Sequence, residues 1–195
     1  VDLCDELNIN IYSFPMKYHP LFGEYSHNRD YIGKYWNRKY IRAVQAVLNS
    51  TKGSIGRGKL YFDKAFGSSP EEYLTLLEMP DTYIIYRFFF EWLDSKEHDL
   101  SMSNWLKALN ALSKEEQMVF YRIIHAKDFV QTKLHPNFGV NINHALSFYV
   151  NLRDAISKPN GELYKLKQEF DLLPKEEIEY IKTRRLQPLN KLVEI

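Results

Sequence analysis

A chain of 195 residues, of which 45% are hydrophobic and 26% charged, has the length and balance of one globular domain, and this composition excludes a wholly disordered chain or a coiled-coil rod. Because 26 Lys and Arg residues stand against 25 Asp and Glu residues, the formal net charge of +1 excludes a general attraction to nucleic acid or to an anionic membrane, so any such contact requires a local patch. The single cysteine, Cys4, excludes an internal disulfide and a cysteine-held metal or iron–sulfur site within this chain, and it favours a reducing, cytoplasmic compartment.

The first predicted element is a short strand from Asn8 to Met16, where apolar and polar residues alternate with a period of two. Pro15 has no amide hydrogen, so it marks the end of this strand or a sheet edge. A lone strand cannot pair its own backbone groups. We therefore expect it to pair with another copy of the chain, with a segment assigned otherwise here, or with a missing part of a longer parent protein, since residues 1–7 resemble the tail of an amphipathic helix.

A long helix is predicted over residues 29–50, and a loop with three glycines over residues 52–59 breaks it. A short apolar helix follows from Leu60 to Phe66, with Gly67 as its C-cap. The backbone amides of the loop are expected at the N-terminus of this short helix, where phosphate or sulfate binds readily, although a tight solvated turn is the favoured explanation of the glycines. The predicted anion-binding patch combines this loop with one face of the long helix and consists of Arg38, Lys39, Arg42, Arg57 and Lys59.

From residue 68 onward the chain is predicted to be a series of capped helices. Ser69 with Glu72, and Ser113 with Glu116, have the spacing of a capping box. Asp81 is the predicted cap of an aromatic helix from Thr82 to Ser95, which we interpret as a buried central helix rather than a stacking platform. Further helices are expected from Ser101 or Ser103 to 112, 113–127, from Asn141 or Asn143 to 152, 160–170 and 175–185.

No catalytic residue is predicted, and no metal site. The six histidines lack the spacing of zinc ligands, although His19 and His27 flank an aromatic loop and could approach one ligand together. Glu91 lies four residues after Arg87, so an intrahelical ion pair is expected rather than an acid or base. The longest apolar run, Tyr83 to Leu93, is too short to cross a membrane, and no membrane contact is expected.

Several segments resemble the C-terminal part of a group of uncharacterised radical S-adenosylmethionine proteins. The first reads Ile-Tyr-Ser-Phe-Pro-Met-Lys-Tyr-His-Pro-Leu, and the set covers under a third of the chain: 11–21, 29–42, 45–49 and 62–67. The resemblance implies that residues 1–67 are a late unit of a partial (β/α) barrel and that residues 68–195 are a helical extension packed as one unit with it. It also implies that the strand end faces S-adenosylmethionine, with Ser13, Phe14 and Met16 as the residues nearest to this cofactor.

The chain departs from this family in one respect that decides its activity. Radical S-adenosylmethionine enzymes hold a [4Fe–4S] cluster with three cysteines, usually spaced CxxxCxxC, and this chain contains only Cys4. We therefore expect a mainly α fold and a C-terminal accessory region of such a protein, a fragment that is inactive alone and contributes to the binding of a substrate or partner. The alternative is a non-enzymatic helical interaction module that binds a protein or nucleic acid through the basic patch.

Overall fold

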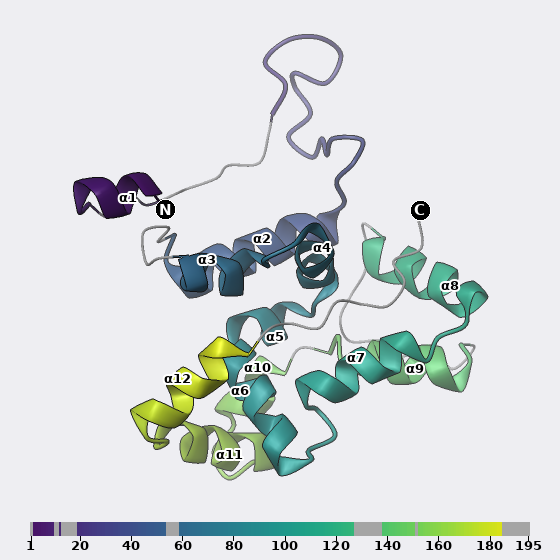
Figure 1. Ribbon diagram of the computed structural model, residues 1–195. Coiled ribbons are helices and arrows are strands. Elements are labelled where there is room, and N and C mark those ends of the chain that lie inside the picture. The colour runs from purple at the N-terminus through teal and green to yellow at the C-terminus, as the bar shows by residue number, and fades with distance from the viewer. Residues whose placement is uncertain are drawn as a thin grey trace.

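The structure is a computed structural model that describes residues 2–9, 12, 19–53, 59–126, 138–150 and 152–184. It is mainly helical, as predicted (Figure 1). The helices are α1 (Asp2–Leu7), α2 (Arg38–Thr51), α3 (Lys59–Phe66), α4 (Pro70–Glu78), α5 (Asp81–Ile85), α6 (Arg87–Trp92), the 3₁₀ turn η1 (Leu93–Lys96), α7 (Met102–Asn110), α8 (Lys114–His125), α9 (Val140–Ser147), α10 (Arg153–Ser157), α11 (Glu162–Asp171) and α12 (Lys175–Thr183).

The predicted N-terminal strand is not supported, because the described part of the chain contains no strand. Asn8 instead follows α1 with a left-handed backbone (φ 49°), a conformation that Asn tolerates better than most residues. The amide of Ile9 donates to the carbonyl of Cys4 at 3.1 Å, which closes the helix end as in a Schellman motif. Most of the remaining residues predicted as strand, including Ser13, Phe14 and Met16, lie outside the described residues.

The long helix begins later than predicted, at Arg38 rather than at Arg29. Asn37 has an extended backbone, and its side chain accepts the amide of Tyr40 at 2.9 Å, so it is the N-cap of α2. The preceding residues form turns, in which the amide of Trp36 donates to the carbonyl of Gly33 at 2.9 Å. The cap at Asn37 sets the start of α2, although the tyrosines upstream have an approximate helical spacing. Residues 19–37 therefore lie outside this helix, and they project from the helical body (Figure 1).

The caps predicted further along the chain are confirmed in most cases. Both halves of the box at Ser113 and Glu116 are present, with distances of 3.2 and 2.8 Å. Ser69 accepts the amide of Glu72 at 3.3 Å, but the Glu72 carboxylate binds Ser68 instead of closing the box. Gly67 ends α3 with φ 88°, and a Cβ there would lie 2.8 Å from the amide nitrogen of residue 73, so glycine is required.

The aromatic segment is buried, as predicted, but it is not one helix. The backbone breaks at Tyr86 (φ −109°, ψ 33°), which separates α5 from α6. Asp81 is the first residue of α5 rather than its cap, and Pro80 takes the cap position. Across the break the ring of Tyr83 stacks on that of Phe90, with centroids 3.8 Å apart, so ring packing holds the two short helices together at the centre of the core.

The other helices pack around this centre. Helix α2 lies against α4 and α5, α12 and α11 lie against α6, and α9 contacts both α7 and α8 (Figure 1). The helices predicted over 160–170 and 175–185 are confirmed as α11 and α12, whereas α9 starts at Val140 after Gly139 rather than at Asn141 or Asn143. No helix within the described ranges combines the length and apolar character needed to cross a bilayer.

Candidate functional site

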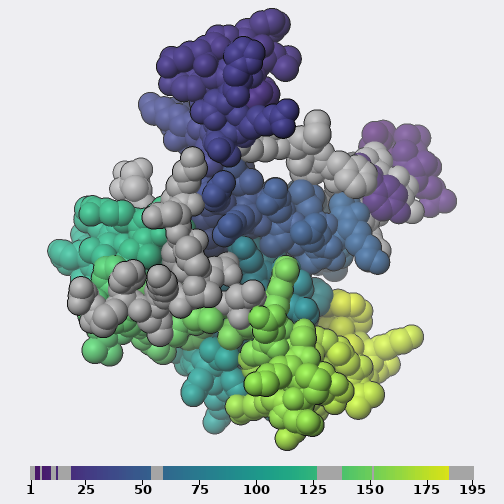
Figure 2. All heavy atoms as spheres, turned by 180° about the vertical axis from the view of Figure 1, so that it is seen from behind, coloured from purple at the N-terminus to yellow at the C-terminus, as the bar shows by residue number. Residues whose placement is uncertain are grey.

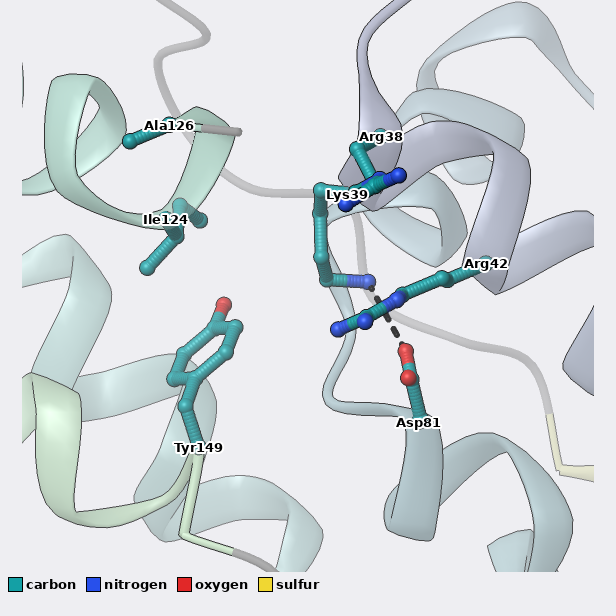
Figure 3. A pocket seen from close by; sticks show the side chains of 7 residues that line it. All are labelled: Arg38, Lys39, Arg42, Asp81, Ile124, Ala126 and Tyr149. Carbon is teal, nitrogen blue, oxygen red and sulfur yellow. Dashed lines mark ion pairs between the residues drawn. The ribbon is translucent and has the colours of Figure 1, made fainter. Parts of the chain in front are cut away.

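A small pocket lies where the first turns of α2 face the turn between α4 and α5 on one side and the end of α8 on the other (Figure 3). Three cations converge on it from α2, opposite one carboxylate and a tyrosine ring. Its cavity volume is about 10 Å³, which is the space of one water-sized group. The lining residues are Arg38, Lys39, Arg42, Asp81, Ile124, Ala126 and Tyr149.

Lys39 forms the buried floor of this pocket. Its ammonium Nζ donates to the carbonyls of Leu77 at 3.0 Å and Met79 at 2.6 Å, and it pairs with Asp81 Oδ1 at 3.5 Å. These carbonyls belong to the C-terminal end of α4, where helix carbonyls lack intrahelical partners and a positive charge is favourable. Burial lowers the pKa of Lys39, while Asp81 acts in the opposite direction. Since two carbonyls accept its N–H bonds and Asp81 balances its charge, Lys39 supports the pocket from inside.

Glu78 is a second buried group beside the pocket, only 1% exposed, and it joins four segments of the chain. Its carboxylate accepts from Tyr40 Oη at 2.6 Å and lies 2.8 Å from His125 Nε2, while its backbone carbonyl accepts from Tyr149 Oη at 2.6 Å. Burial raises the pKa values of Tyr40 and Tyr149, and the charge of Glu78 adds to both increases. These bonds fix the tyrosine that forms one wall of the pocket.

Sequence reasoning missed Glu78 as a site residue. The available signal was a carboxylate within the apolar segment Leu76-Leu77-Glu78-Met79-Pro80, where an unpaired charge would be costly. His125 is the last residue of α8, and its ring is bonded to the buried carboxylate.

The rim of the pocket carries two arginines. Arg38 and Arg42 are one turn apart on α2, and Arg42 is exposed. Asp81 Oδ1 is buried and, among the described residues, has no hydrogen bond in addition to its ion pair with Lys39. The lining therefore has three cations against one carboxylate, with room for one small group that guanidinium N–H bonds can hold.

The structure brings together part of the predicted anion-binding patch. Arg38, Lys39 and Arg42 line one pocket. Lys59 does not line it and pairs within its own helix with Asp63 at 2.7 Å. Arg57 lies outside the described residues, so the contribution of the glycine-rich loop stays a prediction.

A second buried charge network lies at the junction of α3, α6 and α12. Lys64 Nζ pairs with Glu91 at 2.7 Å and donates to the carbonyl of Arg184 at 2.6 Å. Arg87 Nε binds the same carboxylate at 3.0 Å, which confirms the predicted pair within α6. Burial lowers the pKa of Lys64 to about 8, against the opposing effect of Glu91. All partners lie within the chain, so this network is a structural clamp.

The remaining predicted chemistry has no support in the described residues. His19 and His27 are exposed, and no three His, Cys, Asp or Glu side chains there form a group that could hold a metal. Cys4 alone cannot supply the three thiolates of a [4Fe–4S] cluster, so the residues of this chain do not fit that cofactor.

Comparisons with protein-family models, with curated proteins and with solved structures find no match to this chain.

Proposed function

We propose that this chain is a helical interaction module that binds an anionic group of a partner at the pocket below Arg38 and Arg42. The observation that carries this proposal is the exposed guanidinium of Arg42 at the rim of a pocket whose lining holds only one carboxylate, that of Asp81. Carboxylate and phosphate groups are the usual partners of guanidinium, which binds them through paired N–H bonds.

The size of the pocket supports binding of a group that belongs to a larger partner. A cavity of about 10 Å³ is far smaller than the several hundred Å³ of a typical small-molecule site. The acid and base groups next to it are also occupied, since Lys39 binds carbonyls and the Glu78 carboxylate binds Tyr40 and His125. One oxygen of an anion fits at the rim, while the rest of the partner lies over the surface.

This proposal is tested by measuring the affinity of the chain for two polyanions, a short oligonucleotide and polyglutamate, at low and high salt. We expect R42A to weaken binding at least about tenfold, because each strong charged hydrogen bond contributes roughly 1.5–3 kcal/mol. The matched control is K59A, which removes an exposed cation that does not line the pocket. Equal losses in R42A and K59A, or no binding of either polyanion at low salt, would contradict the proposal.

A second proposal rests on the sequence segments described above. Their resemblance to radical S-adenosylmethionine proteins supports a role as a C-terminal accessory region, inactive alone, that contributes to substrate or partner binding. Its test is the genomic reading frame upstream of Val1. A CxxxCxxC triplet there would support this role, and a frame that starts within a few codons of Val1 would contradict it.

A further inference from the structure

Residues 19–37, here called the aromatic arm, expose large rings without packing them on the core. Figure 2 shows this segment as a lobe that stands out from the helical body. The side chains of Phe22, Tyr35 and Trp36 are 88%, 83% and 46% exposed. Turns hold the arm, with the amide of Ser26 bonded to the carbonyl of Gly23 at 3.1 Å and that of Trp36 to Gly33 at 2.9 Å.

The arm leads directly into the pocket rim. Trp36 precedes the N-cap Asn37, so its Cα is at most about 7 Å from that of Arg38, and Arg42 follows one helical turn of about 6 Å later. On the other side, Lys34 Nζ lies 5.5 Å from the centroid of the Tyr35 ring. Two exposed rings therefore stand between cations along a short stretch of chain: Lys34, Tyr35, Trp36, Arg38 and Arg42.

Exposed rings beside cations match one class of polyanion better than the others. A single-stranded nucleic acid alternates phosphates with flat bases, and proteins bind it with a cationic track and aromatic rings on which bases stack. An acidic peptide supplies charge, but few of its side chains have a flat face. In a duplex the base faces are already stacked on one another and are closed to side chains.

We propose that the aromatic arm and the pocket rim together bind single-stranded nucleic acid, with a phosphate at Arg42 and neighbouring bases stacked on Tyr35 and Trp36. This inference rests on the proposed function for the anionic group and adds the class of the partner. Because no base edge is read by this arrangement, the binding tolerates many sequences and weakens as salt rises.

The test is fluorescence anisotropy of labelled RNA and DNA single strands of one sequence, the corresponding duplex, and polyglutamate. The arm variant is Y35A/W36A, whose side chains are outside the core, and its matched control is Y180A, which removes an exposed ring on α12. We expect Y35A/W36A to weaken single-strand binding at least about tenfold, since each stacked base contributes a factor of that order. Binding by Y180A should equal that of the wild type.

The variants separate this inference from the proposed function. R42A should weaken binding of both single strands and polyglutamate, whereas Y35A/W36A should weaken binding of single strands alone. The inference is overturned if the duplex or polyglutamate binds more tightly than the single strands, or if Y35A/W36A binds single strands as tightly as Y180A does. In either case, weaker polyanion binding by R42A would still support the anion site of the proposed function. Failure of every polyanion to bind at low salt overturns both. Tighter binding of RNA or of DNA would show which of the two the partner is.

Discussion

Lys39 is buried and Lys64 is half-buried, and the two ammonium groups have different surroundings. Lys64 is paired closely with Glu91, which also binds Arg87, and the last carbonyls of α12 complete the network. Lys39 has a looser ion pair, 3.5 Å from Asp81, and its closest contacts are the uncharged carbonyls of Leu77 and Met79.

The contrast distinguishes a charge that joins helices through ion pairs from a charge that lies beside a proposed binding surface. At Lys64 the carboxylate of Glu91 lies between two cations, Lys64 and Arg87, so the charges balance within the network. At Lys39 the ammonium group is bonded to the carbonyls at the end of α4 and paired with Asp81, and the arginines of α2 line the pocket next to it (Figure 3). We expect substitutions at the first network to affect stability, and substitutions at the rim of the second to affect binding.

The largest expected effect follows from E91A. This substitution leaves Lys64 and Arg87 buried without their carboxylate, and removing one partner of a buried pair costs about 3–5 kcal/mol of unfolding free energy. The control is D63N, which breaks the exposed pair with Lys59 and should cost less than about 0.5 kcal/mol. Urea unfolding measures both free energies. If E91A lost less than about 1 kcal/mol of unfolding free energy, the Lys64 network would not be a structural clamp.

The next effect is expected from K39M, which leaves the carbonyls of Leu77 and Met79 without a donor. Unsatisfied buried acceptors cost about 1–3 kcal/mol each, and the relief of burying the charge offsets part of this, so we expect a net loss of about 3 kcal/mol. R42A, at an exposed position of the same helix, should unfold at the wild-type urea midpoint. If both variants lose the same stability, the floor and rim of the pocket do not have separate roles.

The pH dependence of stability separates the lysines from the tyrosines. Since burial lowers the pKa of Lys64 to about 8 from its ordinary 10.5, the unfolded chain holds a proton that the folded chain has released between these values, and stability rises with pH by about 2 kcal/mol up to pH 10. The lowered pKa of Lys39 adds to this rise. Above pH 10 stability falls, because burial raises the pKa values of Tyr83 and Tyr149 above their ordinary 10.0 and the folded chain keeps these protons.

The matching variant is K64M, which removes the group with the pKa of about 8. Urea midpoints measured from pH 7 to 11 should rise less steeply in K64M than in the wild type, and both should fall at the highest pH. If the urea midpoint of K64M rose with pH as steeply as that of the wild type, a group other than Lys64 would cause the rise in stability.

The smallest effect is expected from Y149F. It removes one hydroxyl donor from the carbonyl of Glu78, and the loss of one hydrogen bond costs about 1 kcal/mol. Y180F alters an exposed hydroxyl and should have no effect on the thermal midpoint. If Y149F also leaves polyanion binding unchanged, the pocket wall requires the ring of Tyr149 but not the hydrogen bond from its hydroxyl to Glu78.

Local rules predicted those parts of the molecule that depend on neighbours in the sequence. The box at Ser113 and Glu116, the glycine at the end of α3 and the pair of Arg87 with Glu91 each involve residues within one turn, and all are confirmed. The start of α2 was predicted too early because the spacing of upstream tyrosines resembled a helix, while the cap at Asn37 decided the boundary.

Contacts between distant segments could not be predicted in this way. Lys64 joins Glu91 from another helix, and Glu78 binds Tyr40 of α2, His125 of α8 and Tyr149 of the turn after α9. No periodicity encodes these partners, because they meet only after α2, α4 and α8 have packed. The basic patch was predicted as five equivalent cations, whereas folding places Lys39 inside and leaves Arg42 at the surface.

The three tryptophans sit at different depths, and this gives the molecule two independent optical reporters. Trp36 is on the aromatic arm in contact with solvent, while Trp92 and Trp105 are buried in the core. A quencher such as acrylamide reaches the first and not the other two, so emission can be divided between arm and body without any added label. Events on the arm and melting of the helical body can therefore be followed separately in one unmodified sample.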